Sequence, residues 1–247
     1  RSTKEATFWR GLGTGVILLP LPFFMSFDAD IIFFLCLLTI SILAVFADNR
    51  MYTIIREYGG GVAARITPLM VFLTFFMSLV SHPENLYIYT QNPLISGGIV
   101  ASILCAIYCA SHLRSCEVSK KAYLYALIPL ISYAACNILA KISLHHADPQ
   151  SGSFYYVLIQ GWFMGICTVF LIKDIPSGKK SEAIDFTSRA YLLSKRTWLF
   201  GLGMGVVVSI MMISRNFSYL YAFDVSYPVM IQLLAPFWIS LFYVIIK

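Results

Sequence analysis

The sequence predicts an all-α polytopic membrane protein, a bundle of at least eight transmembrane helices. Of the 247 residues, 59% are hydrophobic and 12% are charged, whereas a soluble domain has roughly 25% charged residues. The mean hydropathy is +0.77. The apolar residues form continuous stretches, and about 20 such residues are needed to cross roughly 30 Å of hydrocarbon as a helix. The sequence contains too few polar residues to form the exterior of a soluble protein.

Eight stretches are long and apolar enough to be transmembrane helices. They cover about 8–26, 30–54, 61–82, 93–112, 122–144, 153–173, 197–221 and 227–246. The stretches are continuous rather than alternating, which favours helices over strands. Most connections are short, so neighbouring helices are expected to pack antiparallel. The segment 174–196 is longer and polar, and we expect a solvated loop there.

Charged residues separate between the two ends of the predicted bundle. The basic clusters lie at the start of the chain and in the second, fourth and sixth connections, for example Arg10, Arg50, Lys120 and Lys180. The remaining connections hold Asp28 and Asp30, His82 and Glu84, His145, His146 and Asp148, and Asp224. The positive-inside rule places the basic end in the cytoplasm. The net charge of +6 follows from this bias, and no basic stripe of the kind that binds nucleic acid is present.

The sequence contains no signature of a cofactor or metal site. Six cysteines lie mostly within apolar stretches and form no CxxC pair, so we interpret them as small apolar packing residues. The acidic residues are scattered and form no DxxxD cluster, and HExxH and glycine-rich phosphate loops are missing. We therefore expect a protein that is not an enzyme, with a membrane-embedded transferase as the least favoured alternative.

Two segments of the first half recur in the second half. Arg10-Gly11-x-x-x-Gly15 matches Gln160-Gly161-x-x-x-Gly165, at an offset of 150 residues. Asp48-Asn49-Arg50-Met51-Tyr52 matches Arg215-Asn216-Phe217-Ser218-Tyr219, at an offset of 167. Each match is weak alone, but their shared order indicates an internal repeat.

A proline follows each Asn-x-x-Tyr segment at similar spacing. Pro68 comes 16 residues after Tyr52, and Pro236 comes 17 residues after Tyr219. The repeat divides the chain into residues 1–115, a half that lacks its first helix, and 116–247, a half that lacks its last helix. The complete arrangement is then five plus five helices, and an odd number of helices per half gives inverted repeats. Inverted repeats are typical of secondary transporters with a site near the midplane.

With the proline-centred segments Gly-Val-Ala-Ala-Arg-Ile-Thr-Pro68 and Met-Ile-Gln-Leu-Leu-Ala-Pro236, the chain resembles the ten-helix EamA-type members of the drug/metabolite transporter superfamily. The resemblance extends over nearly the whole chain, through loose motifs. It implies a 5+5 inverted repeat, a central pocket between the halves, and export or exchange of metabolites such as amino acids, nucleotide sugars or drugs. It also implies a cytoplasmic N-terminus for the complete family fold, which is opposite to the orientation that the charges predict.

Polar residues within the apolar stretches are the candidate site, because an ionisable group in hydrocarbon costs about 2.5–3.5 kcal/mol on insertion scales. The candidate substrate-binding residues are Asp48, Asn49, Tyr52, Asn137, Gln160, Arg215, Asn216, Tyr219 and Gln232. Each Asn-x-x-Tyr segment presents an amide and a phenol on one helical face. Hydrogen bonding between helices is the alternative role for these pairs.

Two of the candidate residues, Asp48 and Arg215, are charged, and we expect each to have an oppositely charged partner. Asp48 has Arg50 close by in sequence and Arg215 across the repeat interface as possible partners. Arg215 follows a long apolar stretch at the end where basic residues are otherwise missing. Its charge is not explained by topology, so we expect either an acidic partner or an anionic substrate.

These patterns favour a secondary transporter that moves a small metabolite or drug across the bilayer by alternating access. Coupling to protons through Asp48, uniport and exchange are all compatible with the sequence. A lipid flippase, a channel or an assembly subunit of the same architecture is the alternative. We expect a monomer or homodimer in the bacterial inner membrane, with a small-molecule substrate and the lipid bilayer as its partners.

Overall fold

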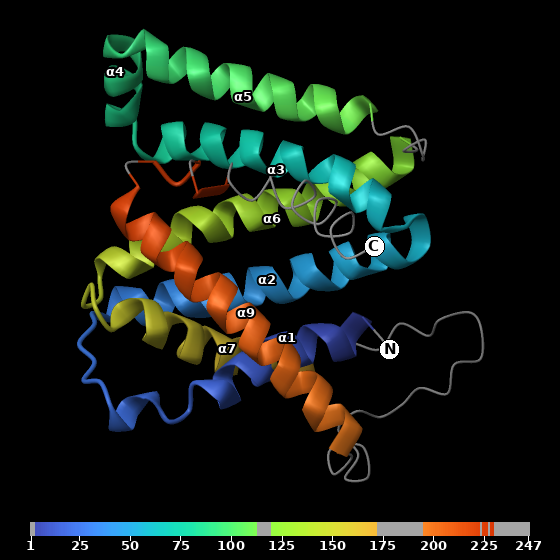
Figure 1. The fold of residues 1–247 in the computed structure, drawn as a ribbon, viewed down its shortest axis with the longest axis vertical. Helices are drawn as coiled ribbons and strands as arrows, with labels where there is room; N and C mark the ends of the chain where they lie inside the picture. The colour runs from blue at the N-terminus through green and yellow to red at the C-terminus, as the bar shows by residue number, and fades with distance from the viewer. Residues whose placement is uncertain (1–2, 113–119, 172–194, 223, 227, 230–247) are drawn as a thin grey trace, which may run out of the picture. The chain divides into compact units, whose positions relative to one another are not determined.

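The computed structural model is all-helical over the residues that it describes, which are 3–112, 120–171, 195–222, 224–226 and 228–229 (Figure 1). The helices are α1 (Thr3–Ile17), the 3-10 helix η1 (Leu21–Phe23), α2 (Ile31–Tyr58), α3 (Gly60–Ser81), α4 (Glu84–Gln91), α5 (Pro93–His112), α6 (Lys120–His145), α7 (Gly152–Leu171) and α9 (Lys195–Tyr221). Within these ranges the β-structure is limited to one isolated bridge, between Ala29 and Ala147. The predicted helical fold class is confirmed.

Four of the described helices are long and apolar enough to cross a membrane. They are Ile31–Tyr58, Leu124–His145, Gly152–Leu171 and Thr197–Tyr221. Each also exposes large apolar side chains; Ile31, Phe170 and Val207, for example, are 71%, 80% and 67% exposed. Exposed apolar side chains on apolar helices are suited to a lipid environment. These helices support the prediction of an integral membrane protein.

Seven of the eight predicted stretches contain a helix, and the boundaries of the first differ from the prediction. The stretch 8–26 was expected to be one helix, but α1 ends at Ile17. Pro20 and Pro22 follow closely, and proline has no N–H to continue a helix and disfavours helical backbone in the preceding residue. Most of the expected helix 227–246 and most of the loop 174–196 lie outside the described residues.

The chain divides into two compact units. Unit 1 comprises Arg1–Asn49 and Leu139–Leu220, and unit 2 comprises Arg50–Ile138 and Tyr221–Lys247. Each unit therefore combines segments from both of the halves, 1–115 and 116–247, that the sequence repeat defines.

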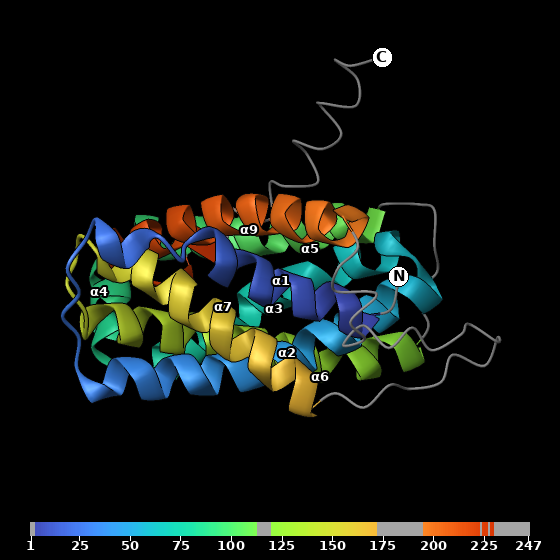
Figure 2. The same ribbon diagram turned by 90° about the horizontal axis from the view of Figure 1, so that it is seen from below.

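In unit 1, α1 packs along α7 through glycines (Figures 1 and 2). A Cβ placed on Gly11 would lie 2.8 Å from the backbone nitrogen of Gly165, and one placed on Gly161 would lie 2.7 Å from the backbone nitrogen of Gly15. Side chains at these positions would hold the helices apart, so glycine is needed for this close approach. Residues 11 and 15 correspond to residues 161 and 165 in the sequence repeat. Under this correspondence, each of the two contacts becomes the other. This exchange is typical of a pseudo-two-fold relationship between α1 and α7.

The other face of α1 packs against α9, also through glycines. A Cβ on Gly13 would meet the backbone of Gly201 and Gly205. Next to this contact, the ring of Trp9 is fully buried and lies edge-on to Trp198, with 5.4 Å between ring centroids. Glycines therefore line both contacts of α1, the one with α7 and the one with α9.

Two of the acidic connections meet at one end of unit 1. The backbone N–H of Asp30 donates to the carbonyl of His146 (3.0 Å), and that of Asp148 donates to the carbonyl of Asp28 (3.1 Å). A polar hollow of about 390 Å³ lies here, lined by Ser26, Asp28, Ala29, Asp30, His145, His146, Ala147 and Asp148. The expectation that these two connections lie at the same end is confirmed within unit 1.

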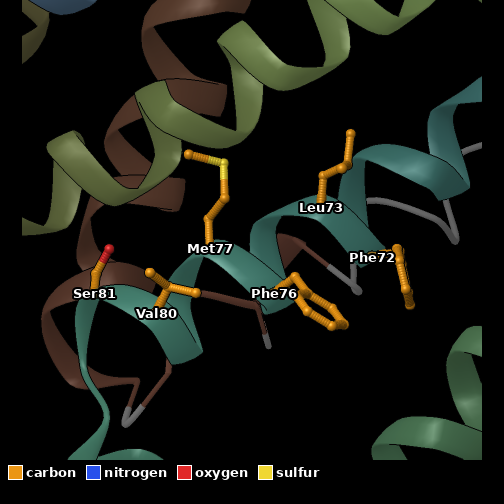
Figure 3. Close-up of a pocket in the computed structure, with 6 residues that line it drawn as sticks. All are labelled: Phe72, Leu73, Phe76, Met77, Val80 and Ser81. Carbon is orange, nitrogen blue, oxygen red and sulfur yellow. The ribbon is translucent and has the colours of Figure 1, made fainter.

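Unit 2 has its own apolar core from three helices. Ile54 of α2, Val62 and Ile66 of α3, and Ala126 and Leu130 of α6 are buried together. One face of α3 carries an apolar hollow of about 430 Å³, lined by Phe72, Leu73, Phe76, Met77, Val80 and Ser81 (Figure 3). With only Ser81 as a polar lining residue, this hollow is suited to a lipid chain rather than a polar substrate.

Candidate functional site

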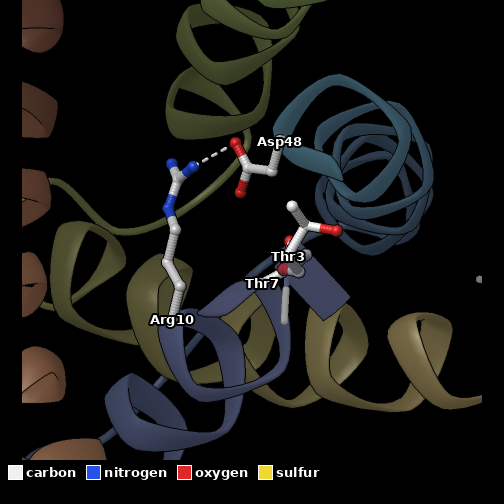
Figure 4. A network of polar contacts seen from close by, with 4 residues as sticks. All are labelled: Thr3, Thr7, Arg10 and Asp48. Carbon is white, nitrogen blue, oxygen red and sulfur yellow. Dashed lines mark hydrogen bonds and ion pairs between the residues drawn. The ribbon is translucent and has the colours of Figure 1, made fainter. Parts of the chain in front are cut away.

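Asp48 of α2 and Arg10 of α1 form an ion pair within unit 1 (Figure 4). The side chain of Asp48 is 1% exposed and that of Arg10 is 19% exposed. The two partners considered from the sequence, Arg50 and Arg215, are not the ones that the structure shows. The guanidinium of Arg50 instead lies 5.4 Å from the ring centroid of Tyr125. Arg10, which resembled a topology anchor, neutralises a buried carboxylate.

Asn49 also contacts α1. The Oγ1 of Thr3 donates a hydrogen bond of 2.8 Å to Oδ1 of Asn49, and the Oγ1 of Thr7 donates to the carbonyl of Thr3. This arrangement matches the alternative role considered for the Asn-x-x-Tyr segment, a hydrogen bond between helices. Tyr52, three residues further along α2, is half-buried and belongs to unit 2.

Asn216 of α9 contacts α7. Its side chain is fully buried, and Nδ2 donates to the backbone carbonyl of Ser153 at 3.4 Å. The amide oxygen of Asn216 and the hydroxyl of Ser153 have no hydrogen-bond partner. The rings of the adjacent residues Phe154 and Phe217 lie edge-on, with 5.8 Å between their centroids.

Two further buried polar side chains follow on the same faces of α7 and α9. Gln160 comes seven residues after Ser153, and Ser209 comes seven residues before Asn216; seven residues are two helical turns, about 10 Å. Gln160 and Ser209 are 4% and 3% exposed, and Oε1 of Gln160 and Oγ of Ser209 have no hydrogen-bond partner. The helices run in opposite directions at the Ser153–Asn216 contact, so both residues lie deeper along their helices. We call Ser153, Gln160, Ser209 and Asn216 the α7–α9 polar set.

Arg215 precedes Asn216 on α9. Its guanidinium lies 5.4 Å from the ring centroid of Tyr219, one turn away on the same helix, and Tyr219 is fully buried. The Nε of Arg215 is buried and has no hydrogen-bond partner. Within the described part of the chain, no acidic side chain is paired with Arg215. The acidic partner considered from the sequence is therefore not found there.

The remaining candidates lie elsewhere. Asn137 belongs to unit 2, is 5% exposed, and donates from Nδ2 to Oγ1 of Thr74 at 3.4 Å. Gln232 lies outside the described residues. Asp48, Asn49, Gln160, Arg215, Asn216 and Tyr219 all belong to unit 1.

Ser153, Ser209 and Asp224 are buried polar residues that were not among the predicted ones. Ser153 and Ser209 share a seven-residue spacing with Gln160 and Asn216, a signal that the sequence does contain. Asp224 follows α9 and was expected in a connection, yet it is fully buried in unit 2. Its carboxylate accepts hydrogen bonds from Oγ of Ser78 (3.0 Å), Oη of Tyr89 (2.9 Å) and the backbone N–H of Ser226 (2.8 Å). No apolar pattern marks these contacts in advance.

Among the residues that the structure describes, no three His, Cys, Asp or Glu side chains are grouped to hold a metal ion. The polar atoms without a partner on Ser153, Gln160, Ser209, Arg215 and Asn216 can act by hydrogen bonding and, at Arg215, by charge. Comparisons with family models, with curated proteins and with solved structures found no match for the chain.

Proposed function

We propose that the protein is a secondary transporter that moves a small polar molecule across the membrane by alternating access. The observation that carries this proposal is the α7–α9 polar set. Its four side chains are nearly fully buried, and each has an oxygen without a hydrogen-bond partner. A buried polar atom left unsatisfied costs about 1–3 kcal/mol, so these unpartnered oxygens on α7 and α9 favour a site that a polar ligand completes.

The wider architecture belongs to the same proposal. It includes eight transmembrane helices, two inverted halves of a 5+5 repeat and an EamA-type ten-helix fold, an architecture in which substrate sites lie near the membrane midplane. The contacts Gly11–Gly165 and Gly161–Gly15 support the repeat. Replacing each residue by its repeat equivalent turns one contact into the other, so the packing of α1 and α7 follows the residue pairing of the sequence repeat. Smooth glycine surfaces also allow helices to shift against each other, which alternating access requires. We place the protein in the bacterial inner membrane, as a monomer or homodimer.

Proton coupling through Asp48 is a further part of the proposal. Because Asp48 is paired with Arg10, protonation of the carboxylate would remove the charge that holds α1 to α2 at this point. An imposed pH gradient across proteoliposomes tests this. Coupling predicts that the gradient drives accumulation by the wild type and not by Asp48→Asn, while exchange or uniport predicts no effect of the gradient on either.

The proposal is tested by reconstituting the full chain in liposomes and measuring uptake of a labelled panel of amino acids, sugar phosphates and nucleotide sugars. The expected result is saturable uptake of at least one compound, lost in Asn216→Leu and kept in Ser218→Ala. Ser218 is an exposed residue of α9, two positions away, and bonds only to its own helix in the described structure. Uptake no faster than in empty liposomes for the whole panel would rule the proposal out.

A further inference from the structure

The repeat relates the Arg10–Asp48 ion pair to two residues of the other half. At the offset of 150, Gln160 stands where Arg10 does, and at the offset of 167, Arg215 stands where Asp48 does. The cation of the first pair is thus replaced by an amide, and its carboxylate by a guanidinium.

The packing of unit 1 supports this equivalence in space. Arg10 directly precedes Gly11 on α1, and Gln160 directly precedes Gly161 on α7. Gly11 and Gly161 make the exchanged contacts described above. The two polar side chains therefore begin at equivalent points of two pseudo-symmetric helices, while Asp48 of α2 and Arg215 of α9 are equivalent by position in the sequence repeat.

The charges of the two arrangements differ. Arg10 and Asp48 together are neutral. Arg215 and Gln160 together carry one positive charge, and in the described structure neither side chain has an acidic partner. Gln160 is 4% exposed. A lone cation in an apolar helix costs about 2.5–3.5 kcal/mol by insertion scales, and an anion supplied from outside the protein removes this cost.

We propose that Arg215, Gln160 and Asn216 form the subsite for a small organic anion, a molecule with a carboxylate or phosphate group and several hydrogen-bond donors. This proposal rests on the transport function proposed above and names its substrate class. The guanidinium offers Nε–H beside Nη–H, a fork that matches two oxygens of such an anion. The unpartnered oxygens Oε1 of Gln160 and Oδ1 of Asn216 accept hydrogen bonds from hydroxyl or ammonium groups on the rest of the molecule.

A double-mutant cycle on the purified full chain in detergent tests the charge imbalance without any ligand. Gln160→Glu supplies the missing carboxylate at the position equivalent to Arg10. It should leave the melting temperature unchanged or raise it when Arg215 is present. In the Arg215→Gln background the same change buries an unpaired carboxylate, and the melting temperature should fall by at least about 5 °C. Equal effects of Gln160→Glu in the two backgrounds overturn the proposal.

A ligand panel tests the substrate class by the same thermal measurement. The probes are gluconate and glucose 6-phosphate, which combine an anion with donors, succinate, an anion without donors at neutral pH, and glucose, donors without an anion. At least one of the first two should raise the melting temperature by about 3 °C, with less effect of succinate and none of glucose. Arg215→Gln should abolish the shift. Arg56→Gln should keep it, because Arg56 is an exposed residue of α2.

A lipid headgroup can present the same chemistry, so the panel is repeated in nanodiscs of phosphatidylcholine with and without phosphatidylglycerol. If phosphatidylglycerol alone gives the Arg215-dependent shift, the anion is a lipid phosphate. If none of gluconate, glucose 6-phosphate or phosphatidylglycerol stabilises the wild type more than glucose, or if the shift survives Arg215→Gln, the proposal is overturned.

This result is separate from the test of transport. Uptake of a neutral compound, with no anion-dependent shift, would refute the anionic substrate class and leave the transporter intact. An Arg215-dependent shift without uptake of any compound would leave the anion subsite intact and refute transport.

Discussion

The guanidinium of Arg10 forms an ion pair with the carboxylate of Asp48, and this pair connects α1 to α2 in unit 1. Asp48 is almost completely buried, so its charge depends on Arg10 for compensation. The repeat equivalents of the two residues, Gln160 and Arg215, cannot form such a pair with each other. The first half therefore has a neutral ion pair that acts as a structural contact, whereas the second half has a cation, unpaired among the described residues, that is a candidate binding site.

Arg10→Gln is expected to destabilise unit 1 by about 3–5 kcal/mol, because it leaves the buried carboxylate of Asp48 without its cation. The double variant Arg10→Gln with Asp48→Asn should recover most of this loss, since it buries no charge. Thermal unfolding in detergent measures both. A double variant as unstable as Arg10→Gln alone would show that the charge pairing is not what Arg10 contributes.

Gly161→Ala is expected to destabilise the contact between α1 and α7. The new methyl group would lie 2.7 Å from the backbone nitrogen of Gly15 and 2.9 Å from the carbonyl oxygen of Gly11, and backbone atoms cannot turn away. Overpacking of this kind costs about 1–3 kcal/mol. The control is Gly203→Ala on α9, where a Cβ meets no atom within 4 Å, and which should be neutral or slightly stabilising. Equal melting temperatures for the two variants would contradict the glycine contact.

How much of this fold follows from sequence depends on whether a feature is local. The apolar stretches predicted the helices, because a membrane helix makes all of its backbone hydrogen bonds within one segment. The early end of α1 could also have been predicted, because Pro20 and Pro22 are local signals. The prediction of a longer helix followed the apolar residues around them instead.

The candidate site depended on tertiary contacts that spacing alone does not contain. From the sequence, Arg50 and Arg215 were the possible partners of Asp48, and only the packing of α1 beside α2 brings Arg10 to it. Asp224 lies among turn-forming residues, and its burial arises from contacts with Ser78 and Tyr89, more than a hundred residues earlier. By contrast, Ser153 and Ser209 each lie seven residues before a predicted residue, Gln160 in α7 and Asn216 in α9, and so share its helix face. Helical periodicity could have found both.

Tyr89→Phe is expected to destabilise unit 2 by about 1–3 kcal/mol, because it removes a donor from the buried carboxylate of Asp224. Tyr87→Phe is the matched control, since Tyr87 belongs to the same helix and is 66% exposed. The difference in melting temperature between the two variants isolates the buried hydrogen bond. Variants of equal stability would show that the Tyr89 hydroxyl contributes nothing to unit 2.

The connection before α7 should contribute stability that is lost in acid. The backbone N–H and hydroxyl of Ser151, with the backbone N–H of Gln150, hydrogen-bond the carboxylate of Asp148 and lower its pKa below its ordinary value. A lowered folded-state pKa stabilises the fold fully above the unfolded value of about 3.9, and the contribution disappears as pH falls below it.

The measurement is the melting temperature of the wild type and Asp148→Asn between pH 7 and pH 3. The wild type should be the more stable at pH 5 and above, and the difference should shrink as the pH falls below about 4. Glu57→Gln, at an exposed carboxylate of α2, controls for the loss of one negative charge. A difference that stays constant down to pH 3 would contradict the assigned role of Asp148.

Asn216→Leu separates a binding role from a packing role most directly. The substitution removes a buried amide whose oxygen has no hydrogen-bond partner and keeps a similar volume, so the stability should change by no more than about 1.5 kcal/mol. Uptake of the labelled panel into proteoliposomes should fall at least about tenfold in Asn216→Leu, as for the loss of about 1.4 kcal/mol of substrate interaction, and should remain at the wild-type level in Ser218→Ala. Uptake by Asn216→Leu that equals uptake by the wild type would contradict transport through the α7–α9 polar set.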